Sequence, residues 1–211
     1  MKTDDLIRAL AADTLRPRPV MTTLMQGLIP SLAIALAVVW FAFGFRADLA
    51  TALVTPVSAI RGVLTVVLGL VSMRIALLLA RPEGRDTARL WPLAVVGAAA
   101  LGMLAWAYVT TPAEARQMAT VGKTITVCLV AIPMLSILPV ASVLYALRQG
   151  ATTAPARAGF VAGLAGSGLS AAIYALHCTE DSPLFYVTWY GLAIMGVTLA
   201  STLIGSRVLR W

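Results

Sequence analysis

The chain has 211 residues, of which 60% are hydrophobic and only 12% carry a charge, whereas a soluble domain has about a quarter of its residues charged. This composition excludes an ordinary soluble domain, and the presence of only two cysteines excludes a secreted disulfide scaffold. The net charge is +7, but the basic residues lie in short tracts between apolar segments, which argues against nucleic-acid binding and is typical of membrane proteins.

The chain begins with a polar segment in which residues 3–14 predict a short helix that Thr3 can cap. Its candidate contact residues are two carboxylates that complement the positive end of the helix and three apolar residues that share one face: Asp4, Asp5, Leu6, Ile7 and Leu10. A helix of this length is marginally stable alone, so its apolar face needs a surface on which to dock. The membrane surface is one alternative, but the acidic half of the helix favours a protein partner with a basic docking surface.

Six apolar stretches follow, and each is long enough for a helix to cross the hydrocarbon core, which needs about 20 residues. They cover approximately residues 27–45, 57–80, 90–110, 121–147, 158–177 and 183–206. We therefore expect an all-α integral membrane protein, a bundle of six transmembrane helices. Its two parts would be a cytoplasmic N-terminal segment, residues 1–25, and a transmembrane domain, residues 26–211.

The predicted second span contains two charged residues, Arg61 and Arg74. Each lies within about two helical turns of an end of the span, so we expect both side chains to extend toward the lipid headgroups.

The predicted fifth span has a small residue at every fourth position: Gly159, Gly163, Ser167, Ala171 and Ala175. Such a stripe lets a neighbouring helix approach closely. The stripe could pack within the chain or between copies, so the sequence leaves the oligomeric state open.

Basic residues are distributed unevenly between the two ends of the predicted bundle. Eleven Lys or Arg belong to the N-terminal segment, the 81–89 loop, the 148–157 loop and the C-terminus, whereas only four belong to the other end. Since Lys and Arg are retained on the cytoplasmic side, we expect a bacterial inner-membrane protein with both termini in the cytoplasm.

This orientation gives the two cysteines a common location. Cys128 would lie roughly 8 Å below the outer surface on the fourth span, and Cys178 ends the fifth span at the same surface. Both thiols then belong to the periplasmic half, where an oxidising environment favours a disulfide or a bound metal ion.

Cys178 lies in a tract that runs from the only histidine of the chain to Pro183. Thiolate and imidazole groups bind Cu(I) and Zn²⁺, so the tract is a candidate site for a regulatory ion, and no constitutive cofactor is expected. The candidate ligands are Cys128, Cys178 and His177, and the residues expected to support the loop are Glu180 and Asp181. Two simpler interpretations remain: residues 181–183 cap the sixth helix, and Cys128 is a small buried hydrophobic residue.

Two segments carry a resemblance to a known family. They are the opening Met1–Ile7 with Leu10, Ala11, Asp13, Pro17 and Pro19, and the tract His177–Phe185 with Trp189 and Tyr190. In these segments, and in its six spans, the chain resembles the NrsF family of membrane anti-sigma factors. The resemblance implies a protein that holds an extracytoplasmic-function sigma factor inactive at the membrane through its N-terminal helix. It also implies release under heavy-metal or oxidative stress, sensed by cysteines matching Cys128 and Cys178.

Two other classes of function fit the sequence less well. A small transporter or metal exporter needs ionisable residues along a path near the middle of the membrane, and the predicted spans lack them. A quinone-linked thiol oxidase needs a C-x-x-C pair, which the sequence does not contain. We expect no catalytic residues and no enzyme activity. The sequence does not distinguish a disulfide from a metal thiolate, and it does not identify the sigma factor or the inducer.

Overall fold

The computed structural model describes Thr3, Asp5, Ile7 and residues 19–210, and this part of the chain contains helices and no strand. Six helical segments are long and apolar enough to cross a membrane, as the sequence predicts. The helices that form them are α2 (Val20–Val38) with its π-helical continuation η1 (Val39–Phe43), α4 (Pro56–Leu79), α6 (Trp91–Thr110), α8 (Ile125–Arg148), α9 (Pro155–Tyr174) and α10 (Pro183–Val208). The shorter helices α3 (Leu49–Val54), α5 (Gly84–Thr87) and α7 (Ala113–Val121) lie between them.

The first long helix begins earlier than the apolar pattern predicts. It starts at Val20, whereas the predicted span starts at residue 27, because Thr22, Thr23 and Gln26 interrupt the apolar run without interrupting the helix. The predicted division between residues 25 and 26 therefore falls inside α2.

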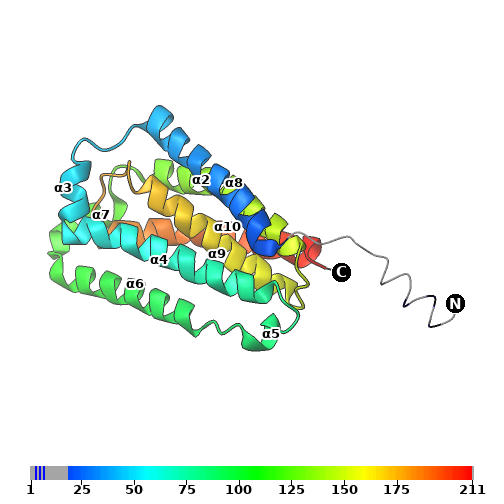
Figure 1. The fold of residues 1–211 in the computed structure, drawn as a ribbon. Helices are drawn as coiled ribbons and strands as arrows, with labels where there is room; N and C mark the ends of the chain where they lie inside the picture. The colour runs from blue at the N-terminus through cyan, green and yellow to red at the C-terminus, as the bar shows by residue number, and fades with distance from the viewer. Residues whose placement is uncertain (1–2, 4, 6, 8–18, 211) are drawn as a thin grey trace.

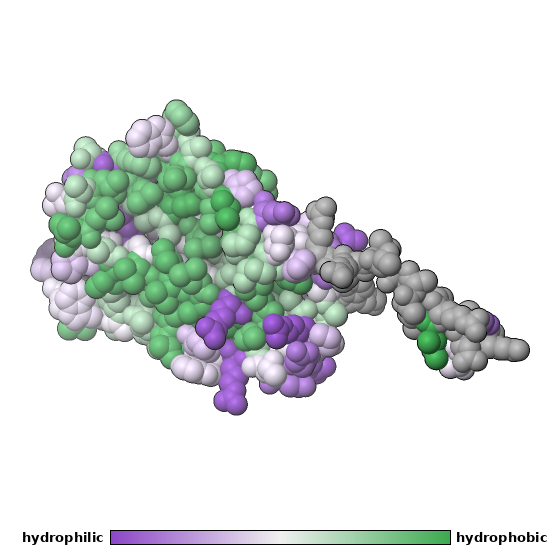
Figure 2. Space-filling view, in the orientation of Figure 1, coloured by the Kyte–Doolittle hydropathy of each residue, from purple (hydrophilic) through white to green (hydrophobic). Residues whose placement is uncertain are grey.

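Helix α9 lies at the centre of the bundle and packs against α10, α4 and α8 (Figure 1). Helix α2 packs mainly on α8, and α6 packs only lightly on α10 and α4, so both lie at edges of the bundle. The start of α2 and the end of α10 lie at the same end, which we call the terminal end (Figure 1). Apolar side chains cover most of the long side of the bundle, as a surface facing lipid requires (Figure 2).

Small residues of α9 allow the close helix contacts at this centre. A Cβ atom added to Gly163 would lie 2.7 Å from the Thr198 Cα atom of α10. A Cβ atom added to Gly168 would lie 3.0 Å from the Gly69 backbone nitrogen of α4. Gly163 belongs to the predicted stripe, and so does Gly159, whose added Cβ atom would lie 2.6 Å from the Ser201 carbonyl oxygen of α10. These members of the stripe therefore pack against α10 of the same chain.

We expect Gly163→Ala to destabilise the protein by about 1–3 kcal/mol, because α9 and α10 must separate to make room for the methyl group. The measurement is thermal unfolding in detergent micelles. Gly191→Ala is the matched control on α10, since nothing lies within 4 Å of its added Cβ atom. The control should be neutral or stabilising by up to about 1 kcal/mol. Equal stabilities of the two variants would contradict the close packing of α9 against α10 at Gly163.

Candidate functional site

The two cysteines lie together at the end of the bundle opposite the terminal end, and we call this the thiol end. Cys128 is in the first turn of α8, and Cys178 is in the loop between α9 and α10. Both are free thiols, and both are fully buried. They belong to one cluster of buried side chains that also contains Tyr174 of α9 and Tyr190 of α10. The structure thus brings the two predicted sensor thiols into one site.

The two tyrosines contribute hydroxyl groups to this otherwise apolar cluster. Their ring centroids are 5.7 Å apart, and both hydroxyl groups are buried without a hydrogen-bond partner among the residues that the structure describes. A buried hydroxyl can donate a hydrogen bond to a thiolate, and such a bond favours the charged form of the thiol. The site therefore contains two thiols and, in the same cluster, two buried hydroxyl groups that are free to donate a hydrogen bond.

A buried arginine of α4 holds the loop that contains Cys178. Arg61 donates from Nη1 to the Glu180 carbonyl oxygen at 2.7 Å. From Nη2 it donates to the carbonyl oxygens of Ala175 and Cys178, at 3.1 and 3.0 Å. These carbonyls follow the end of α9, where backbone acceptors have no partner within the helix. The charge of Arg61 is therefore used to fix the backbone of the loop.

The expectation that Arg61 extends toward the headgroups is wrong. Only 2% of the residue is exposed, and its guanidinium group points into the protein. Arg74, on the same helix, is exposed. The difference arises because unpaired carbonyls lie beside Arg61 and offer its charge a better partner than the membrane surface does.

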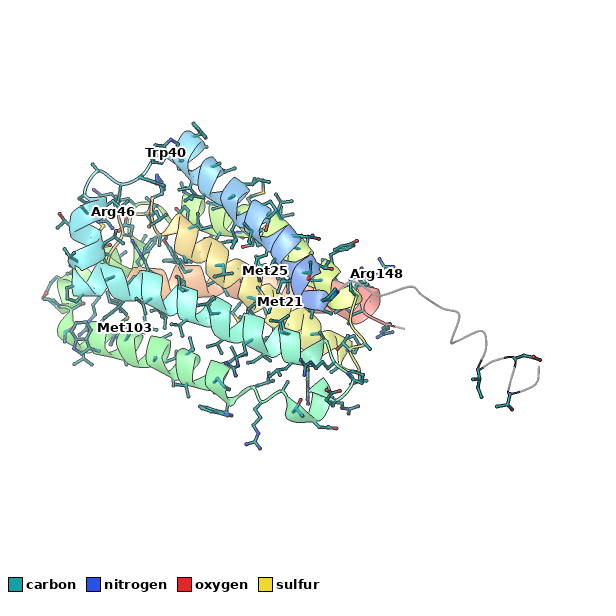
Figure 3. The ribbon with its side chains drawn as sticks, in the orientation of Figure 1. Met21, Met25, Trp40, Arg46, Met103 and Arg148 are labelled. Atoms are coloured by element: carbon teal, nitrogen blue, oxygen red, sulfur yellow. The ribbon has the colours of Figure 1, made fainter. Side chains whose placement is uncertain are left out.

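A second arginine, Arg46, holds the same loop from the connection between η1 and α3. Its Nη1 and Nη2 atoms pair with the two carboxylate oxygens of Asp181, each at 2.8 Å. Nη1 also donates to the Cys178 carbonyl oxygen at 3.2 Å, so both arginines share this acceptor. On its other side, Arg46 pairs with both carboxylate oxygens of Asp48 at 2.8 Å. Figure 3 places Arg46 at the thiol end, far from Arg148 at the terminal end.

These ion pairs keep the loop charged over the whole physiological pH range. The hydrogen bonds of the two carboxylates raise the pKa of Arg46, and the hydrogen bond from Arg46 lowers the pKa of Asp48. Burial raises the pKa of Asp181, but the hydrogen bonds from Arg46 and Ser58 and the charge of Arg61 outweigh burial. The pKa of Asp181 therefore lies below its ordinary value, and the pair with Arg46 stays intact at neutral pH.

The other predicted loop residues make contacts of their own. His177 Nδ1 lies 2.9 Å from the Gly44 carbonyl oxygen, and Glu180 Oε1 accepts a hydrogen bond from the Lys123 backbone nitrogen at 2.8 Å. Across the described residues, no three His, Cys, Asp or Glu side chains form a group that could hold a metal ion. The structure thus places the two thiols in one buried cluster and holds His177 against the connection after η1.

The tract after Cys178 also begins α10, as the capping interpretation predicts. Ser182 occupies the N-cap position and Pro183 the first helical position. The Ser182 side chain makes no capping hydrogen bond, and Asp181 binds Arg46. The same residues therefore start a helix and anchor the loop.

The predicted contact face of the N-terminal helix is only partly described. Asp5 and Ile7 are helical and exposed, with 58% of Ile7 accessible. Asp4, Leu6 and Leu10 lie outside the described residues. The role of this face in binding a partner remains a prediction.

The role of the two arginines in holding the loop was not predicted, because Arg46 was counted only as a marker of orientation and Arg61 was expected to extend toward the headgroups. A signal was present: Arg46 and Arg61 were predicted at the same end of the bundle as the acidic pair Glu180 and Asp181. Opposite charges confined to one apolar end are expected to pair.

The chain matches known proteins over nearly its whole length. A family model described as "Negative regulator of sigma F", NrsF, matches residues 9–211. The chain is 34% identical to "Anti-sigma-F factor NrsF" of Caulobacter vibrioides (strain NA1000 / CB15N). It is 33% identical to "Probable anti-sigma-F factor NrsF" of Azospira oryzae (strain ATCC BAA-33 / DSM 13638 / PS). Both alignments cover the full length of both proteins. No solved structure matches the chain significantly.

Proposed function

The chain belongs to the NrsF family of negative regulators of sigma F, and from this we propose that it is a membrane-bound anti-sigma factor. It sequesters an extracytoplasmic-function sigma factor through its N-terminal segment and releases it when a thiophilic ion or an oxidant reaches the cysteine pair. The observation that carries the proposal is the full-length similarity to two proteins named as anti-sigma-F factors. The pairing of Cys128 and Cys178 in one buried cluster supports the sensing part.

The chemistry of sensing requires that both thiols react together. A Cu(I) ion that bridges Cys128 and Cys178 displaces their two protons, because the thiolate is the ligand. An oxidant that forms the disulfide instead accepts two electrons and two protons. Either product favours a conformation in which the sulfur atoms are bridged. The signal releases the sigma factor only if that conformation binds the sigma factor more weakly.

The proposed orientation puts the terminal end in the cytoplasm and the thiol end in the periplasm of a bacterial inner membrane. Its support is the concentration of basic residues in the connection from α4 to α6 and at the two helix ends that flank the loop from α8 to α9. These two loops contact each other, since the Ala151 backbone nitrogen donates to the Ala80 carbonyl oxygen at 2.8 Å. Basic residues distant in sequence are therefore gathered at one end.

The test is capture of the purified sigma factor by the full-length protein in membranes. We expect Ile7→Asp to weaken capture by about tenfold or more, since a charge replaces an apolar contact. Asp5→Asn should weaken it as well, whereas Asp86→Asn, an exposed acidic residue near the terminal end, should not. Failure of the wild-type protein to bind the sigma factor, or copper transport by the protein in vesicles, would contradict the proposal.

A further inference from the structure

Three residues connect the thiol end of α2 to the loop between α9 and α10. Arg46 lies three residues after the end of η1, and its backbone nitrogen donates to the Leu176 carbonyl oxygen at 3.1 Å. Its guanidinium group pairs with Asp181, and His177 Nδ1 lies 2.9 Å from the Gly44 carbonyl oxygen. We call Arg46, His177 and Asp181 the latch. Through the latch, α2 is attached to the backbone beside Cys178.

Helix α2 packs closely on α8 at Gly27. A Cβ atom added to Gly27 would lie 3.1 Å from the Ser142 Cβ atom of α8, and Leu24 and Leu28 are buried in the core. Gly27 therefore marks a point about which α2 is held.

Toward the thiol end, α2 and α8 separate. A groove of about 570 Å³ lies between them, and its walls are almost entirely apolar. Its lining includes Ile34, Val38 and Phe43 on the α2 side and Val127, Val130 and Met134 on the α8 side. The last turn of this helical segment is the π-helix η1, an irregularity that is frequent at functional sites. The groove leaves room on the α8 side of this end of α2, while Val39 is buried in the cluster that contains Cys128. The latch joins the same end to the α9–α10 loop.

We propose that α2 transmits the state of the thiols to the N-terminal segment, and that the latch holds α2 in the position that binds the sigma factor. This inference rests on the proposed function. The Cys178 carbonyl oxygen is shared by Arg46 and Arg61, so drawing Cys178 toward Cys128 disturbs the latch directly. Helix α2 then moves at its thiol end, and its other end leads into the segment proposed to bind the sigma factor.

The lengths of the helix on the two sides of Gly27 make this transmission feasible. From Gly27 to the end of η1 the helix measures about 24 Å, and from Gly27 to Val20 about 10 Å. A displacement of about 3 Å at the latch therefore moves the start of α2 by about 1 Å, which is in the range of the helix shifts that alter interfaces.

The test is sigma-dependent transcription without inducer, in cells that carry the full-length protein. Asp181→Asn should raise this basal transcription by about tenfold, because it weakens a charge-assisted bond that crosses between the two segments. Asp48→Asn is the matched control: Asp48 binds the same arginine, but it lies on the same connection and its bond does not cross to the loop. The control should stay repressed and inducible. An equal rise in both variants would overturn the proposal.

His177→Phe provides a second variant, because it keeps a ring of similar size and removes the contact with Gly44. If immunoblots show that Asp181→Asn does not reach the membrane, the basal transcription of the His177→Phe variant tests the role of the latch instead. Normal repression and induction in the latch variants that reach the membrane would overturn the role of α2. If the wild-type protein represses transcription and responds to inducer in that same experiment, and captures the sigma factor in membranes, the proposed function stands. If the wild-type protein does not bind the sigma factor, the proposed function itself fails.

Discussion

Replacing Cys178 by serine is expected to abolish release of the sigma factor by every inducer while leaving repression intact, and Cys128→Ser should do the same. Serine has nearly the same size, so the buried cluster keeps its packing, but its hydroxyl group neither forms a disulfide nor binds a soft metal ion. The measurement is sigma-dependent transcription with and without copper or a thiol oxidant.

Cys128→Ala is the control that separates reactivity from polarity. If the thiol acts by its chemistry, the alanine and serine variants should both remain repressed and unresponsive. If the double-serine variant responds to all inducers of the wild-type protein, Cys128 and Cys178 are not the sensor. Gel mobility under non-reducing conditions and metal content of the purified protein would then distinguish a disulfide from a metal thiolate.

Replacing Arg61 by methionine is expected to destabilise the protein by about 2–5 kcal/mol, because the buried carbonyl oxygens of Ala175 and Cys178 lose this donor. Methionine fills a similar volume, so the effect reports the lost hydrogen bonds more than a cavity. For a chain of this length, the midpoint of thermal unfolding in detergent should fall by about 5–15 °C.

Arg74→Met is the matched control, since Arg74 is an arginine on the same helix and is exposed. Its effect should stay within about 0.5 kcal/mol. If Arg74→Met lost as much stability as the Arg61 variant, the loss would be due to removal of a positive charge from α4 and not to the hydrogen bonds of Arg61.

The six apolar helices could be predicted because a membrane-spanning helix is encoded locally, as an uninterrupted apolar run. The shared location of Cys128 and Cys178 could be predicted from the same apolar runs. Each run crosses the membrane once, so the start of the fourth span and the end of the fifth span lie on the same side. The start of α2 could not be predicted in this way. Polar residues such as Thr23 and Gln26 end the apolar pattern, but they are compatible with a helix that continues past the hydrocarbon core.

The arginine contacts could not be predicted from the sequence, for a different reason. Most partners of Arg61 are backbone carbonyl oxygens more than 100 residues away, and the largest sequence separation is 119 residues. Every residue has such a carbonyl, so the acceptors have no sequence signature. Asp181 was predicted to support the loop, and the structure supplies its partner, Arg46.

The central position of α9 has a consequence for biosynthesis. This helix is buried on most of its surface and is the least apolar of the six, since its small residues contribute contact with other helices more than affinity for lipid. Alone in a bilayer it would be poorly retained, so its stable insertion requires not only α8, which is made before it, but also α10, with which it makes its most extensive contact. A nascent chain halted before α10 should therefore be recognised by quality-control proteases, even though five of its six hydrophobic segments are already made.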